Sequence, residues 1–121
     1  MTREFVWTTA FISGWYRCGF DDDNLRQLEV QLLADPKAGD VIRGTGRARK
    51  LRFAYEGRGK SGSARVIYVD FEIGEKICGL AVYAKNEKAD LTMDEKHTIK
   101  KAIEAIEPYY DRKGGNNGSS V

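Results

Sequence analysis

Hydrophobic and polar residues alternate at a period of two in the middle of the chain. Leu51, Phe53 and Tyr55 are separated by single residues, and this alternation predicts a half-buried strand over about residues 48–55. Two stretches rich in β-branched and aromatic residues follow, and they predict strands over about 64–73 and 77–85. Short Gly-containing turns separate the three strands. The sequence therefore predicts a three-stranded antiparallel meander.

The segments that flank the predicted meander carry apolar residues at the helical spacing of three and four positions. This spacing predicts helices over about residues 8–17, 23–34 and 93–107. Aspartates at 21–23 supply a cap and first-turn acids to the second of these helices. Thr92 and Glu95 form a capping box for the last helix, and Pro108 is expected to end it. Residues 3–7, REFVW, predict a short N-terminal strand.

These elements predict one α+β domain over residues 1–112, followed by a disordered tail over 113–121. The domain would be a twisted antiparallel β-sheet with two N-terminal helices and a C-terminal helix. We expect the helices to pack on one face of the sheet, with Leu28 of the second helix and Ile103 of the last helix in one core. The other face of the sheet would then carry a basic cleft.

Basic residues are concentrated in one segment, from Arg43 to Arg65. The segment has eight lysines and arginines and one glutamate, a net charge of +7, whereas the remaining 12 basic and 17 acidic residues sum to −5. A basic block on a nearly neutral chain is typical of a surface that binds phosphate groups. The alternative is an edge strand whose charges prevent aggregation, but about two or three charges suffice for that purpose.

Other chemistries lack the residues that they need. The chain has two cysteines and one histidine, too few for a zinc site, and we predict neither a metal nor a cofactor. Cys18 and Cys78 are expected to be free thiols in a reducing cytoplasm, with a disulfide as the alternative. GKS at 59–61 lacks the upstream glycine of a nucleotide-binding loop and lies between two predicted strands. No apolar run approaches the ~18 to 20 residues that span a membrane.

A basic surface can cleave RNA without a histidine. The 2′-OH of RNA is an internal nucleophile, so an enzyme needs to align it with the phosphorus and to neutralise the charge that develops on the phosphorane. Arginine and lysine side chains can serve both purposes. A lysine whose pKa is lowered among like charges can also transfer protons. The basic segment therefore fits an RNase as well as a binding protein.

The order of the predicted elements resembles the RelE/ParE superfamily of bacterial toxins. Two motifs resemble its HigB-type members more closely: DVIRGTGRARKLRFAYEGRGKSGSARVIY over residues 40–68 and LAVYAKNEKADLT over 80–92. The resemblance covers about residues 3–107 and implies a RelE-like fold. For the RelE branch it implies a cytoplasmic mRNA endonuclease that acts in the A site of the 70S ribosome. It also implies a cognate helix-turn-helix antitoxin of the HigA type that silences the toxin.

Matching to the family implies which residues form the catalytic site. Lys50 and Arg52 stand where the family has lysines on the first meander strand, and Arg65 stands where it has an arginine that opens the next strand. Lys85 and Asn86 stand at the end of the last strand, where some members have an arginine that contacts the scissile phosphate. Asn86 is thus a departure from the family pattern.

Further basic residues of the segment are expected to bind 16S rRNA or the flanking mRNA. These predicted RNA-binding residues are Arg47, Arg49, Arg58 and Lys60. The resemblance leaves one alternative, because the ParE branch has the same fold and inhibits DNA gyrase without cutting RNA. A non-catalytic RNA-binding protein is a further alternative. The density of basic residues favours the RNase branch.

Overall fold

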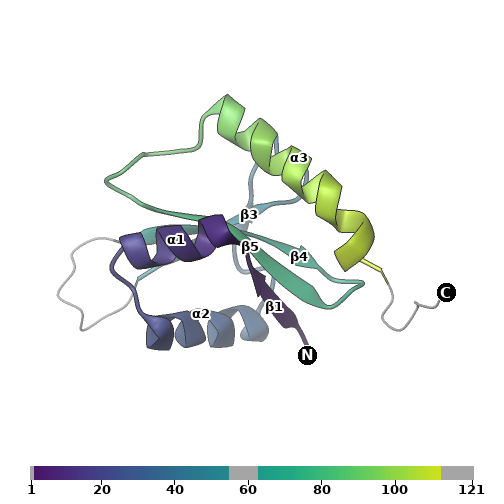
Figure 1. Cartoon of the computed structure of the whole chain (residues 1–121), viewed down its shortest axis with the longest axis horizontal. Helices are drawn as coiled ribbons and strands as arrows, with labels where there is room; N and C mark the ends of the chain where they lie inside the picture. Colours follow the sequence, from purple (N-terminus) through teal and green to yellow (C-terminus); the bar gives the residue numbers. More distant parts are fainter. Residues whose placement is uncertain (1, 55–62, 113–121) are drawn as a thin grey trace.

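The helices and strands follow the order that the sequence predicts, with one added strand. The computed structural model describes residues 2–54 and 63–112 (Figure 1). In chain order the elements are β1 (Glu4–Trp7), α1 (Thr9–Arg17), α2 (Asp22–Ala34), β2 (Asp40–Val41), β3 (Arg49–Phe53), β4 (Ala64–Phe71), β5 (Lys76–Ala84) and α3 (Met93–Tyr110). The added strand is β2. The predicted tail over 113–121 lies outside the described residues.

The five strands form one sheet in the order β1-β5-β4-β3-β2. β3, β4 and β5 pair antiparallel, which confirms the predicted meander. β1 instead pairs parallel with β5, with Glu4 opposite Lys76 and Trp7 opposite Gly79. The sheet is therefore mixed, not antiparallel throughout as predicted. A parallel pair requires a long crossover connection, and the chain between β1 and β5 provides one.

Helices cover both faces of the sheet, and the prediction of helices on one face is wrong (Figure 1). Successive residues of a strand point to opposite faces, and nearly every residue of β4 is buried. Val66 and Tyr68 belong to the core that α1 and α2 cover. Ile67 and Val69 belong to the core under α3. A strand that is apolar on both faces is typical of a sheet covered on both sides.

Leu28 and Ile103 are both buried, but they lie in different cores. Leu28 of α2 packs in the cluster that includes Phe11 and Trp15, whereas Ile103 of α3 lies in the cluster with Phe71 on the other face. The prediction of one shared core is therefore wrong. The helical period identifies the apolar side of each helix, but it does not identify the face of the sheet that this side covers.

A bulge in β5 changes the face to which its last residues point. The register between β4 and β5 shifts between Ile67 and Tyr68, and Leu80 is left without a partner. One extra residue moves the alternation of side chains by one position. Tyr83 therefore lies in the core on the α3 side, directly opposite Arg65 in the ladder.

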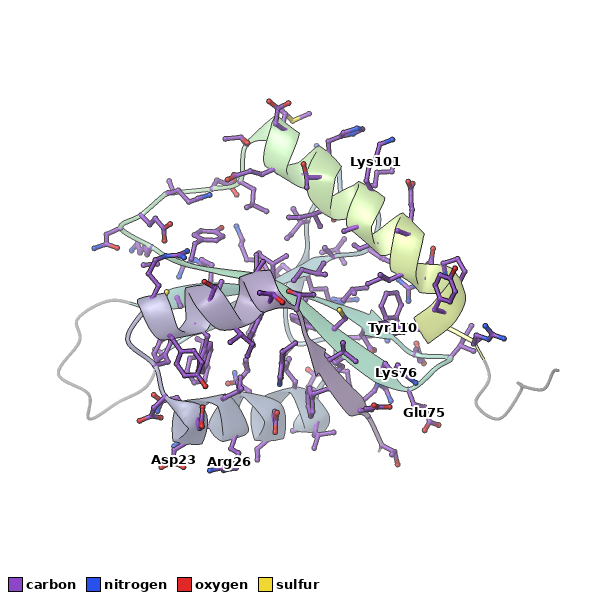
Figure 2. All side chains as sticks on the ribbon, viewed as in Figure 1. Asp23, Arg26, Glu75, Lys76, Lys101 and Tyr110 are labelled. Atoms are coloured by element: carbon purple, nitrogen blue, oxygen red, sulfur yellow. The ribbon has the colours of Figure 1, made fainter. Side chains whose placement is uncertain are left out.

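The C-terminal helix begins and ends through identifiable contacts. Thr92 and Glu95 form the predicted capping box. The helix does not end at Pro108 as predicted but continues to Tyr110. Proline removes one backbone donor, but the last turn is held because the Tyr110 ring packs edge-on against Phe71 at 6.1 Å between ring centroids. Figure 2 shows Tyr110 pointing from α3 toward the β4–β5 hairpin.

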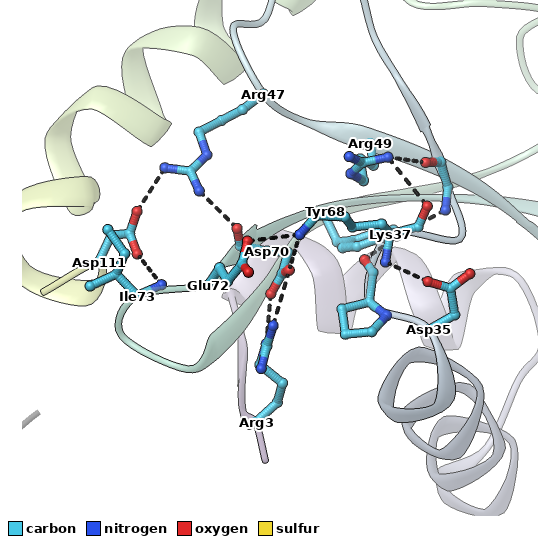
Figure 3. Close-up of polar contacts among 12 residues, drawn as sticks. Arg3, Asp35, Lys37, Arg47, Arg49, Tyr68, Asp70, Glu72, Ile73 and Asp111 are labelled. Carbon is cyan, nitrogen blue, oxygen red and sulfur yellow. Dashed lines mark hydrogen bonds and ion pairs between the residues drawn. The ribbon is translucent and has the colours of Figure 1, made fainter. Parts of the chain in front are cut away.

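An ion-pair network at the end of β4 holds two other segments in place, the N-terminal residues before β1 and the connection that follows α2 (Figure 3). Arg3 Nε lies 2.7 Å from Asp70 Oδ1, and the two side chains are only 7% and 3% exposed. Lys37 Nζ lies 3.3 Å from Asp70 Oδ2 and 2.9 Å from Glu72 Oε1. The hydrogen bond with Asp70 raises the pKa of Arg3. Asp70 thus holds both the N-terminal segment and the connection after α2.

The two cysteines pack against cores on opposite faces of the sheet, which is against the alternative of a disulfide between them. Cys18 is half-buried, and Cys78 lies in the core under α3. Burial raises the pKa of the Cys78 thiol to about 11. Because the thiolate is the reactive form of cysteine, Cys78 is unreactive at neutral pH.

Candidate nucleic-acid interface

A row of cationic side chains crosses the α3 side of the sheet where β4 begins. Arg52 of β3 lies opposite Arg65 of β4, which in turn lies opposite Tyr83 of β5. Lys50 lies two residues before Arg52, so both side chains point to the same face. The sheet therefore brings together three residues that are separated by up to 15 positions in the sequence.

Lys85 and Asn86 lie at the same end of the sheet. The backbone N–H of Lys85 donates to the carbonyl oxygen of Ser63 at 3.2 Å, which joins the end of β5 to the start of β4. Both Lys85 and Asn86 are exposed in the turn after β5. We call Lys50, Arg52, Arg65 and Lys85 the cationic site. Asn86 lies beside it and adds an amide but no charge.

Ser63 holds the two arginines of the cationic site side by side. Its Oγ accepts a hydrogen bond from Arg52 Nε at 3.1 Å and one from Arg65 Nη1 at 3.0 Å. Ser63 is 6% exposed, so this hydroxyl is fixed within the protein. No carboxylate of the described residues forms an ion pair with either arginine. Two fixed guanidinium groups without a described counter-ion form a site for an anion such as phosphate.

The connection between β5 and α3 places acids next to the cationic site. Lys50 Nζ lies 3.5 Å from Asp90 Oδ1, and the Asp90 side chain is 62% exposed. The backbone N–H of Leu91 and the charge of Lys50 lower the pKa of Asp90. Lys88 forms an ion pair with Glu95 of α3. In the structure, Lys50 is thus the one member of the cationic site that pairs with a described acid.

Two residues of this region were not predicted from the sequence, Ser63 and Tyr83. Tyr83 is 3% exposed, and burial raises the pKa of its phenol, as does the charge of Asp90. Lys88 Nζ lies 5.4 Å from the centre of the Tyr83 ring. The sequence holds one sign of Ser63, because it lies two residues before Arg65 and alternate residues of an extended chain point to the same side. No sequence signal placed Tyr83 here, because the bulge at Leu80 decides its face.

Arg47 lies apart from the cationic site, because it contacts Asp70 near the end of β4 whereas Arg65 lies at its start. Figure 3 shows Arg47 beside Asp70 and Asp111. Its guanidinium donates to Glu107 Oε2 at 2.6 Å, to Asp111 Oδ2 at 2.8 Å and to the carbonyl oxygen of Asp70 at 2.9 Å. It also lies over the Phe71 ring, 5.2 Å from the centroid. These contacts tie the end of α3 to the sheet.

Arg49 lies on the face opposite Lys50 and Arg52, because neighbouring residues of β3 alternate. Its Nη1 donates to the carbonyl oxygens of Gly39 at 2.7 Å and Lys37 at 3.3 Å. The structure therefore does not bring Arg47 or Arg49 to the cationic site. The predicted RNA-binding residues Arg58 and Lys60 lie outside the described residues.

Two other kinds of site have no support in the described part of the chain. Residues 2–54 and 63–112 contain no group of three His, Cys, Asp or Glu side chains placed to hold a metal ion. Within the same ranges, no helix has the length and apolar character needed to cross a membrane.

Fold and site together define a small α+β protein with a cluster of cationic side chains on the α3 side of its sheet. The family model described as "RelE toxin of RelE / RelB toxin-antitoxin system" matches residues 22–113. The chain belongs to this family. Its fold is similar to that of a free-state E. coli toxin RelE in which two arginines are replaced by alanine. The TM-score is 0.52 at 15% sequence identity, over 74% of this chain and 90% of that chain.

Proposed function

We propose that the chain is the toxin of a type II toxin–antitoxin system and that it cleaves mRNA on the ribosome, as a HigB-type member of its family. The observation that carries this proposal is the pair of guanidinium groups, Arg52 and Arg65, that Ser63 holds side by side. Two such groups match the oxygens of a phosphodiester. Membership of the RelE toxin family supports the same conclusion.

The proposed reaction uses the 2′-OH of the RNA as the nucleophile. The 2′ oxygen loses its proton and attacks the adjacent phosphorus, and the bond from phosphorus to the 5′ oxygen breaks. The 5′ oxygen then takes up a proton, which leaves a 2′,3′-cyclic phosphate and a 5′-OH. Negative charge increases on the phosphoryl oxygens during the attack. Arg52 and Arg65 would stabilise this charge because they are fixed before the substrate arrives, and Lys50 and Lys85 would bind the phosphate.

The cationic site by itself would be a slow nuclease. It aligns a phosphate, but RNA is flexible, and the 2′ oxygen must lie in line with the leaving 5′ oxygen. We propose that the 70S ribosome supplies this alignment by holding the mRNA in its A site, which places the toxin in the cytoplasm. During growth, a helix-turn-helix antitoxin of the HigA type would cover the cationic site with acidic residues.

Cleavage on programmed ribosomes tests the proposed function. Purified toxin is added to 70S ribosomes that carry a defined mRNA with an empty A site, and fragments are mapped by primer extension. We expect cuts within the A-site codon and no cuts in the same mRNA without ribosomes. Addition of the antitoxin encoded beside the gene should abolish the cuts. Intact mRNA together with gyrase-dependent DNA breaks would contradict the proposal and would favour the ParE-like alternative.

A further inference from the structure

The hydroxyl group of Tyr83 is buried and lacks a partner. Tyr83 is 3% exposed, and among the residues that the structure describes its Oη makes no hydrogen bond. A buried polar group without a partner is costly and uncommon in folded proteins. Phenylalanine would fill the same space without this cost. The hydroxyl therefore needs an explanation beyond packing.

Tyr68 on the neighbouring strand β4 shows how a structural tyrosine is accommodated in this fold. Its Oη accepts a hydrogen bond from the Gly39 N–H at 2.9 Å and donates one to the Pro36 carbonyl at 2.8 Å. Tyr68 lies on the opposite face of the sheet, in the core under α1 and α2. Tyr83 has a similar burial but none of these contacts.

Tyr83 lies in the core under α3 and next to the cationic site. It lies directly opposite Arg65 in the β4–β5 ladder, and its phenol is close enough to Arg65 and Asp90 for both charges to act on its ionisation. A phenol is protonated at neutral pH; burial and the Asp90 carboxylate raise the pKa of Tyr83 further, while the charge of Arg65 lowers it. The hydroxyl thus remains a hydrogen-bond donor next to a phosphate-binding arginine.

We propose that Tyr83 is a further substrate-contacting residue, which donates a hydrogen bond to the RNA phosphate that Arg65 binds. The inference rests on the proposed function and adds a neutral donor to the cationic site. The donor lies in the row that Arg52 and Arg65 begin, so the three side chains present donors from adjacent strands.

An exposed acid whose charge acts on the Tyr83 phenol, Asp90, can be displaced by RNA. Asp90 pairs with Lys50 at 3.5 Å, and its side chain is 62% exposed. Exposed ion pairs are weak, and a phosphate competes with the carboxylate for the same lysine. When a phosphate replaces Asp90 on Lys50, the carboxylate leaves the neighbourhood of Tyr83 and the phosphate oxygens take its place.

The test compares Tyr83→Phe with Tyr68→Phe, which removes the same atom from the opposite face. Each protein is assayed for single-turnover cleavage on programmed 70S ribosomes, for ribosome binding and for thermal unfolding. Tyr83→Phe should cleave about 10- to 100-fold more slowly, the usual effect of losing a hydrogen bond to a charged group. Its melting temperature should equal that of the wild type or exceed it by up to about 5 °C, because an unsatisfied buried group is removed.

Tyr68→Phe should show the reverse pattern. Loss of its two hydrogen bonds should lower the melting temperature, while the cleavage rate of the folded protein stays within about twofold of the wild type. If Tyr83→Phe cleaves like the wild type, or loses activity only together with stability, Tyr83 is structural and the inference is wrong. If the wild type itself cuts no mRNA on ribosomes, the proposed function fails instead, so the two failures are distinguishable.

Discussion

Arg65→Ala is expected to reduce single-turnover mRNA cleavage on programmed ribosomes by about 10² to 10³-fold. Arg65 is the central member of the row, with Arg52 on one side and Tyr83 on the other. Its hydrogen bond to the buried Ser63 hydroxyl fixes the guanidinium before substrate binds. A donor that is fixed in advance stabilises developing charge without reorganisation, which is why its loss has a large effect on rate.

Two control variants separate catalysis from charge and from folding. Arg65→Lys keeps the charge but lacks the planar pair of donors, so it should be nearly as defective as Arg65→Ala. Arg26→Ala removes an exposed charge from α2, where Asp23 and Arg26 point away from the sheet (Figure 2), and should cleave at the wild-type rate. All three proteins should melt within a few degrees of the wild type. Wild-type cleavage by Arg65→Ala would show that Arg65 is structural.

Asp70→Asn should lower the free energy of unfolding by about 3 to 5 kcal/mol. The substitution keeps the size of the side chain but removes the charge that pairs with Arg3 and Lys37. Arg3 is 7% exposed and would remain as a buried cation without a counter-ion. Urea unfolding should therefore show a lower midpoint with an unchanged slope.

Glu72→Gln is the matched control for Asp70→Asn. Glu72 contacts the same Lys37 at 2.9 Å, but the side chains are 66% and 51% exposed. An exposed ion pair contributes at most about 1 kcal/mol, so the two variants should differ clearly in stability. Equal losses for both variants would mean that burial of the Arg3–Asp70 pair does not matter as argued (Figure 3).

The strands and helices could be predicted because each carries a local pattern. The meander follows from alternation and from the apolar character of β4, and the start of α3 follows from the Thr92–Glu95 capping box. The predicted end of α3 was too early, because a proline such as Pro108 usually ends a helix. Packing of Tyr110 on Phe71 outweighs that tendency.

The layers of the fold depend on contacts that no local pattern encodes. The helical spacing identifies both Leu28 and Ile103 as core residues. The path of the whole chain decides which face of the sheet each helix covers. The parallel pairing of β1 with β5 has the same origin. The continuous apolar run of β4 was the one available sign that both faces are covered.

The candidate site was predicted in part. Residue types and family resemblance identified Lys50, Arg52 and Arg65, and the sheet brings them together on one face. Charge alone could not show that Arg49 lies on the opposite face from Lys50 and Arg52, because neighbouring residues of a strand point to opposite faces. The position of Tyr83 opposite Arg65 depends on the bulge in β5, a feature that the sequence does not reveal.

The central claim is that RNA binds on the α3 side of the sheet, and Arg52→Gln against Arg49→Gln tests it most directly. The two arginines lie on one strand but on opposite faces, and glutamine retains a donor for the contacts of each. The measurement is the affinity for mRNA-programmed 70S ribosomes over a series of salt concentrations. Each lost phosphate contact should reduce the slope of log K against log[salt] by about 0.7 to 0.9. We expect this reduction for Arg52→Gln and an unchanged slope for Arg49→Gln; an unchanged slope for Arg52→Gln with a reduced slope for Arg49→Gln would contradict the account.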